Sequence, residues 1–110
     1  MTINIQDDPV EFMIELKKGF EEMVKEGIDC KINTVNVNPI TYKEIIDTIV
    51  NQVGLNLDPT VSGETMIIDI VVVEDAEVKK GVVIVDAILD GVRMRVDYNV
   101  IKLMFGVKAL

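Results

Sequence analysis

Apolar side chains recur every three or four residues between Pro9 and Glu26, which is the spacing of one face of a helix. Asp8 can accept hydrogen bonds at the start of such a helix, and Pro9 suits its first position because the N–H that proline lacks has no helical partner there. Gly27 permits the left-handed backbone that ends many helices. The residues predicted to face the core are Phe12, Met13, Leu16, Phe20, Met23 and Val24.

A second helical pattern follows Asn38-Pro39, where isoleucines and valines recur at helical spacing as far as Val53. Thr41 and Glu44 stand three residues apart, as the two partners of a capping box do. We therefore expect Thr41 to cap this helix. Residues 55–64 contain turn-forming pairs and predict a surface loop.

Alternation of apolar and polar residues predicts strands in the rest of the chain. Residues 28–37 alternate, but the phase slips at Asn33–Thr34, which indicates a β-bulge. Thr2 to Gln6 alternates over a shorter span and predicts an edge strand. Cys30 falls on the apolar side of the 28–37 strand, so we expect a buried and unreactive thiol.

The last third of the chain predicts three consecutive strands over 66–73, 82–89 and 92–98. Asp90-Gly91 stands between the last two and is a strong signal for a two-residue hairpin. Helical spacing returns after Asn99 and predicts a short C-terminal helix. The fold expected is α+β: two amphipathic helices packed on a mainly antiparallel sheet that ends in a three-stranded meander, in one domain over 1–110.

The composition excludes most side-chain catalysis. The 110 residues include no histidine, one cysteine and one serine, Ser62. A Ser-His-Asp or Cys-His site cannot be built from them, nor can a metal centre of histidines or clustered cysteines. Glycine-rich phosphate loops are also missing. We therefore expect the protein not to be an enzyme and to need no cofactor other than, in one alternative below, Ca²⁺ or Mg²⁺.

The charge balance limits the classes of partner that the protein is expected to bind. The formal net charge is −8, and lysines and arginines are scattered, whereas nucleic-acid binding needs a concentrated basic face. No stretch approaches the roughly 20 apolar residues of a membrane span, and the N-terminus does not have the pattern of a secretory signal. We expect a cytoplasmic protein that binds neither nucleic acid nor membrane.

One row of polar residues interrupts the predicted sheet. The Asp90-Gly91 turn sets Asp86 opposite Arg95. If the 66–73 strand lies beside the 82–89 strand, Asp69 joins them, and two carboxylates flank one guanidinium. The first interpretation is a structural ion pair on the sheet surface. The alternative is a carboxylate pair in which one pKa is raised, forming an acid/base or cation site.

The densest acidic cluster, Glu74, Asp75 and Glu77, lies in the predicted loop between two strands. Flexible acidic loops supply the oxygen ligands that Ca²⁺ and Mg²⁺ require, although the spacing of an EF-hand is absent. Lys79-Lys80 follows and offsets part of the charge. A solvated loop is the simpler interpretation, and a divalent-cation site is the alternative.

Besides an enzyme that works by carboxylates alone, which would need a pocket that the sequence does not show, these features lead to two hypotheses about function. The first is a non-enzymatic protein-interaction or assembly module, because the polar row shares its sheet face with apolar residues that favour a protein partner or a second copy of the chain. The residues concerned are Val71, Val73, Ile84 and Ile88. The alternative is a divalent-cation-binding protein that uses the acidic loop and the sheet carboxylates.

Overall fold

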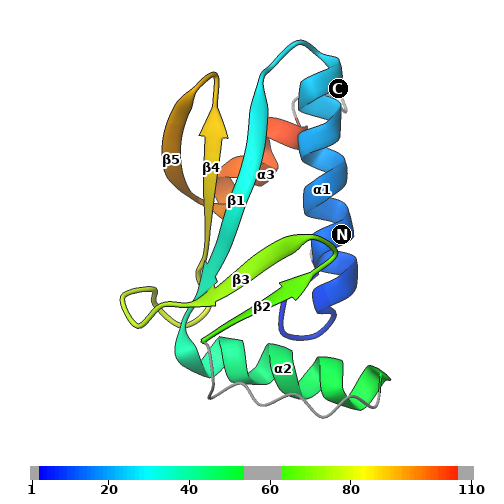
Figure 1. Ribbon diagram of the computed structural model, residues 1–110, viewed down its shortest axis with the longest axis vertical. Coiled ribbons are helices and arrows are strands. Elements are labelled where there is room, and N and C mark those ends of the chain that lie inside the picture. The colour runs from blue at the N-terminus through cyan, green and yellow to red at the C-terminus, as the bar shows by residue number, and fades with distance from the viewer. Residues whose placement is uncertain (1–2, 54–62, 107–110) are drawn as a thin grey trace.

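The computed structural model describes residues 3–53 and 63–106 and contains three helices and five strands (Figure 1). In chain order these are α1 (Pro9–Lys25), β1 (Cys30–Val37), α2 (Pro39–Val53), β2 (Glu64–Ile67), β3 (Ile70–Glu74), β4 (Val83–Leu89), β5 (Val92–Asp97) and α3 (Tyr98–Gly106). The predicted 55–64 loop falls, over 55–62, outside the described residues.

The strands form one open sheet in the order β2-β3-β1-β4-β5. Three of the four neighbouring pairs are antiparallel, and β1 with β3 is the parallel pair. The α+β class and the mainly antiparallel sheet are therefore confirmed. The predicted meander is wrong in one respect, because β1 lies between β3 and β4 and separates strands that are consecutive in the sequence.

The predicted 66–73 strand divides into β2 and β3. Ile68 and Asp69 adopt positive φ angles of 49° and 64°, and they form a two-residue turn between the paired residues Ile67 and Ile70. Such turns normally carry Asn-Gly or Asp-Gly, because β-branched residues rarely adopt positive φ. The sequence therefore offers no local signal for this turn.

The core lies between one face of the sheet and the helices. α1, α2 and α3 all contribute to the same buried cluster, together with alternate residues of β1, β3 and β4. The side chains from these three strands are Val35, Val37, Ile70, Val72, Val85 and Ala87. The hairpin of β4 and β5 extends past this cluster, because Val92 and Met94 are 60% and 40% exposed.

The predicted α1 cap, bulge and last hairpin are confirmed. The Asp8 carboxylate accepts a hydrogen bond from the Glu11 N–H at 3.2 Å, as a cap of α1. The register between β1 and β4 shifts between Ile32 and Thr34. The last hairpin turns at Asp90 and Gly91, whose positive φ angles are 50° and 81°.

Two predicted helix starts are wrong by a few residues, and one predicted strand is not present in the described residues. The Asn38 side chain caps α2 by accepting from the Ile40 N–H at 2.9 Å, so the helix begins at Pro39 and Thr41 is buried in its first turn. Asp97 accepts from the Asn99 N–H at 2.8 Å, and α3 begins at Tyr98. Over the described residues 3–6 there is no strand.

Gly19 in α1 lies directly against the side chain of Phe105 in α3. A Cβ atom at this position of α1 would overlap the Phe105 ring of α3, which packs edge-on against Phe20 with ring centroids 5.9 Å apart. Glycine normally weakens a helix interior by roughly 0.5–1 kcal/mol relative to alanine. Its presence here is explained by the ring that lies against it.

We therefore expect Gly19→Ala to lower the free energy of unfolding by about 1 kcal/mol, since overpacking outweighs the gain in helix propensity. In a Phe105→Ala background the same substitution is expected to raise stability by about 0.5–1 kcal/mol. Urea unfolding of the four proteins of this cycle measures both effects. Stabilisation by Gly19→Ala in the wild-type background would contradict the packing described.

Candidate functional site

The predicted polar row is present only in part. Asp86 and Arg95 are opposite each other in the β4–β5 register, as expected. The Asp86 carboxylate, however, is held by Arg93, whose Nε donates to Oδ1 at 3.1 Å and whose Nη2 donates to Oδ2 at 3.0 Å. Arg95 instead reaches Asp75, with Nη2 donating to Oδ2 at 3.1 Å. Diagonal neighbours on two strands are within reach of long side chains, which permits this exchange of partners.

Asp69 is not part of the row. It lies in the β2–β3 turn with its side chain 88% exposed, and its nearest cation is Lys17, at 4.0 Å. The position beside Asp86 belongs to Thr34, because β1 separates β3 from β4. The two carboxylates that the acid/base interpretation requires are therefore on different parts of the surface.

The electrostatics of Asp86 support a structural ion pair. Its side chain is 3% exposed, while that of Arg93 is 72% exposed. The hydrogen bonds from Arg93 lower the pKa of Asp86, burial opposes them, and a further bond from Asn33 lowers the pKa again. A carboxyl that acts as a general acid near neutral pH needs the opposite shift.

In the acidic loop, the carboxylate of Asp75 is hydrogen-bonded to other groups of the protein. Asp75 accepts from the Glu77 N–H at 2.9 Å through Oδ1 and from Arg95 through Oδ2, whereas Glu74 and Glu77 are exposed. Within residues 3–53 and 63–106, no three acidic or cysteine side chains are grouped so that they could hold a metal ion. A Ca²⁺ or Mg²⁺ site at this loop remains a prediction.

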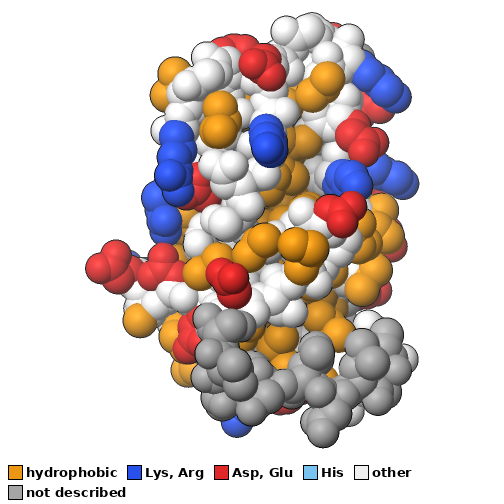
Figure 2. All heavy atoms as spheres, in the orientation of Figure 1, with side chains coloured by type: hydrophobic (Ala, Val, Ile, Leu, Met, Phe, Trp, Pro, Cys, Tyr) orange, Lys and Arg blue, Asp and Glu red, His pale blue; other side chains and the backbone are white. Residues whose placement is uncertain are grey.

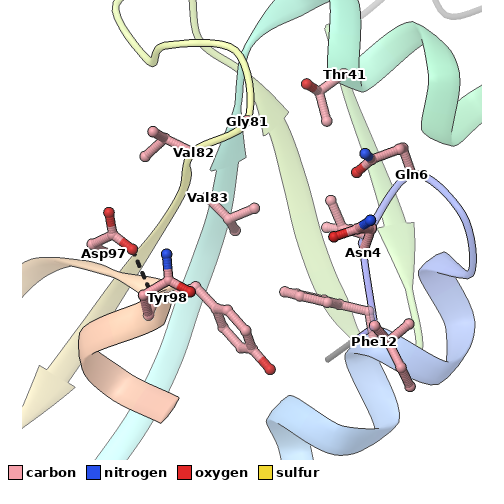
Figure 3. A pocket seen from close by; sticks show the side chains of 12 residues that line it. Asn4, Gln6, Phe12, Thr41, Gly81, Val82, Val83, Asp97 and Tyr98 are labelled. Atoms are coloured by element: carbon pink, nitrogen blue, oxygen red, sulfur yellow. Dashed lines mark hydrogen bonds between the residues drawn. The ribbon is translucent and has the colours of Figure 1, made fainter. Parts of the chain in front are cut away.

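A small cavity of about 130 Å³ with a mixed polar and apolar lining lies where the N-terminal segment meets β4 and the start of α3 (Figure 3). Asn4, Gln6 and Thr41 are on one side of it, with Asp97 across from them, and the rings of Phe12 and Tyr98 lie at one end. The ring centroids are 4.5 Å apart. Ligand pockets usually have about 300–1,000 Å³, so this cavity accommodates water or a very small group.

A larger apolar groove, of about 460 Å³, lies between the C-terminal half of α1, the start of β1 and the β2–β3 turn. We name it the α1–β1 groove. Figure 2 shows its orange side chains between β1 and α1, above the β2–β3 turn, with charged side chains around them. The apolar lining consists of Phe20, Val24, Cys30, Ile32, Ile68 and Ile70.

The groove exists because β1 is longer than its parallel neighbour. β3 pairs with β1 only from Thr34 to Val37, so the β1 residues Lys31 and Ile32 extend past the start of β3. On its other side β1 is paired with β4 along its whole length. In the described part of the chain, no strand pairs with Lys31 or Ile32 on the β3 side.

Two residues of the groove differ from their predicted environment. Val24, predicted to face the core, is 53% exposed and forms part of the α1 wall. Cys30 does point towards α1, as expected, but it is half-buried, and its Sγ lies 3.6 Å from the Phe20 carbonyl oxygen. Val24 lies at the edge of the apolar stripe of α1, so its position in the pattern could have indicated a boundary of the core.

Basic residues surround the groove. Lys17 and Lys25 project from α1 and Lys31 from β1, and the acidic residues of the lining are Glu21 and Asp69. In the whole chain acidic residues outnumber basic ones by 19 to 11. The groove is thus a basic and apolar site on an acidic protein.

The Asp86–Arg93 pair leads to a pH-dependent prediction. Because folding lowers the pKa of Asp86, the pair stabilises the fold above the unfolded carboxyl pKa of about 4, and this stabilisation is lost as pH falls through the folded value. We expect Asp86→Asn to cost about 1 kcal/mol at pH 7, with the difference from wild type shrinking below pH of about 4. Chemical unfolding at several pH values measures this difference.

Arg93→Met and Arg95→Met form a matched pair for the same site. NMR titration of the Asp86 carboxyl is expected to show a higher pKa in the Arg93 variant and a smaller rise in the Arg95 variant, since only Arg93 bonds it directly. Equal shifts in the two variants would contradict the assignment of partners.

The bonds within the acidic loop predict weak cation binding. Because Asp75 is already bonded to Arg95 and to the backbone, Ca²⁺ and Mg²⁺ are expected to produce small, non-saturating ¹H–¹⁵N shifts at Glu74, Asp75 and Glu77. Arg95→Met frees one carboxylate oxygen of Asp75 and is expected to enlarge these shifts. Saturable shifts confined to the loop of the wild-type protein would instead support the divalent-cation hypothesis.

Comparison of the chain with protein-family models, with curated proteins and with solved structures found no match in any of the three. Over residues 3–53 and 63–106, no helix is long and apolar enough to cross a membrane. The surface of this chain is therefore the basis for inferring its function. On that surface the α1–β1 groove is the candidate functional site.

Proposed function

We propose that the protein is a non-enzymatic protein-interaction module whose binding surface is the α1–β1 groove. The observation that carries this proposal is the combination, in one place, of an apolar groove of about 460 Å³ and a stretch of β1 that extends past its neighbouring strand. Exposed apolar surface rimmed by polar groups is typical of sites that bind another protein.

Two exposed side chains define the walls of the groove. Val24 from α1 is 53% exposed, and Ile68 from the β2–β3 turn is 36% exposed. Burial of apolar surface contributes roughly 25 cal/mol per Å² to the free energy of binding. A partner that covers both side chains therefore binds more tightly, because it removes their apolar surface from water. The fold does not need either residue in this position for its core.

The chemistry of the groove favours binding over catalysis. Its ionisable side chains are lysines, Glu21, Asp69 and the thiol of Cys30. The chain contains no histidine that could activate the thiol as a base. Recognition of a partner requires only the shape, apolar area and charge that the groove has.

A second copy of the chain is the other class of partner suggested by the sheet. The apolar residues that favour a second copy lie half-buried on the sheet face opposite the helices. They are Val71, Val73, Ile84 and Ile88. On this face the arginine pairs with Asp86 and Asp75 lie beside the apolar residues. We favour a different protein at the α1–β1 groove, where the apolar residues are more exposed.

The test uses a photo-crosslinking amino acid at Val24 in the full chain, with Val100 as the matched control. Val100 is also a valine on a helix, is 52% exposed, and does not line the groove. We expect a discrete heterotypic adduct from position 24 in the native host and none from position 100. Mass spectrometry identifies the partner, which is then purified.

Binding of the purified partner is then compared between Val24→Asp and Val100→Asp by calorimetry. Only the first substitution is expected to weaken binding, by about ten-fold or more, since it places a charge in the apolar contact. Light scattering separates self-association from binding of another protein. Equal binding to both variants, or adducts that contain only this chain, would overturn the proposal.

A further inference from the structure

The proposed interaction function rests on the groove as a surface, but the groove also constrains the form of the partner. We propose that the partner supplies an extended segment with the order apolar–acidic–apolar, which adds to the sheet as a short strand beside Lys31 and Ile32 of β1. The inference depends on the proposed function, and it rests on three features of the groove.

The first feature is the backbone of β1. Its β3 edge is covered from Thr34 onward, while Lys31 and Ile32 precede the first β1–β3 pair. Backbone N–H and C=O groups at a strand edge pair readily with another extended chain. The start of β3 at Ile70 and the preceding turn close one end of this edge, so that the added strand is short.

The second feature is the alternation of side chains along β1. Ile32 and Cys30 point towards α1, where they line the groove with Phe20 and Val24. Strand alternation sets the side chain of Lys31 on the other face of the sheet, so Lys31 borders the groove from the edge of β1. A strand added beside β1 alternates in the same way. Residues i and i+2 of that strand therefore place their side chains in the apolar groove. Residue i+1, between them, emerges beside Lys31.

The third feature is the charge around this edge. Lys31 is exposed and, among the described residues, takes part in no ion pair. Lys17 and Lys25 lie on the α1 side, where Asp69 and Glu22 are their respective partners at 4.0 and 3.5 Å. Complementary charge across an interface favours the correct partner and speeds encounter. The residue of the added strand that emerges beside Lys31 is thus acidic.

A second copy of the chain fits this edge poorly. Each copy has a formal net charge of −8, so two copies repel each other. The sheet of the described residues ends in β2 and β5. β5 alternates apolar residues with Arg93 and Arg95, which would oppose Lys31, and β2 has the order Glu64-Thr65-Met66-Ile67. β2 has no acidic residue between two apolar ones, and in β5 Asp97 is the last residue of the strand, because Tyr98 begins α3.

The experiment titrates the ¹³C,¹⁵N-labelled protein with the capped peptide Gly-Ser-Val-Glu-Val-Ser-Gly. We expect saturable shifts at the Lys31 and Ile32 amides and at the Val24 and Ile68 methyl groups, below a peptide concentration of about 2 mM. The matched Val-Lys-Val peptide is expected to bind about five-fold more weakly, and Lys31→Glu is expected to reverse this preference.

A peptide methylated on the backbone nitrogens of both valines tests the strand itself, because it retains the side chains but loses two donors. It is expected to lose binding. Equal binding of the Glu and Lys peptides, retained binding of the methylated peptide, or no saturable shift would each overturn the inference. A crosslinked partner that is still sensitive to Val24→Asp would leave the proposed function standing, which distinguishes the two failures.

Discussion

The structure depends on the position of β1 at the centre of the sheet. This strand pairs with β3 in parallel and with β4 in antiparallel orientation, and Val35 and Val37 are fully buried against the helices. Its eight residues exceed the four that β3 covers. The excess length produces the two features that matter for function, a free strand edge and the apolar groove between that edge and α1.

The two faces of the sheet are stabilised by different interactions. The helices cover one face and bury a continuous apolar cluster. On the other face Asn36 is 4% exposed, and its side-chain amide donates to Thr34 at 3.1 Å and to the Ile84 carbonyl at 3.3 Å. The Asp86–Arg93 pair continues this polar layer. Buried polar groups that are fully bonded specify strand register, because a slip would leave them without partners.

Two of the carboxylates that attract attention in the sequence are bonded within the fold. Asp86 is bonded by Arg93 and Asn33, Asp75 by Arg95 and the backbone, and Asp69 is a solvated turn residue. The candidate functional surface consists instead of ordinary apolar residues. Val24 and Ile68 are unremarkable in the sequence, and they become informative only when β1 and the β2–β3 turn bring them together.

Some elements of the fold depend only on residues that are close together in the sequence, and these could be predicted from the sequence. The periodicity of α1, the Asp8 cap, the bulge at Asn33–Thr34 and the Asp90-Gly91 hairpin each depend on a few consecutive residues, so the sequence by itself determined them. It also determined that no histidine-based chemistry is present. The α+β class followed from the order of these elements.

Only the tertiary structure decided which strands are neighbours. Apolar alternation makes a strand probable but does not name its partner, since pairing depends on the packing of residues far apart in the chain. The insertion of β1 between β3 and β4, the tight turn at Ile68–Asp69 and the exchange of arginine partners all result from that packing. The α1–β1 groove is a consequence of strand lengths within the assembled sheet, and no local pattern contains it.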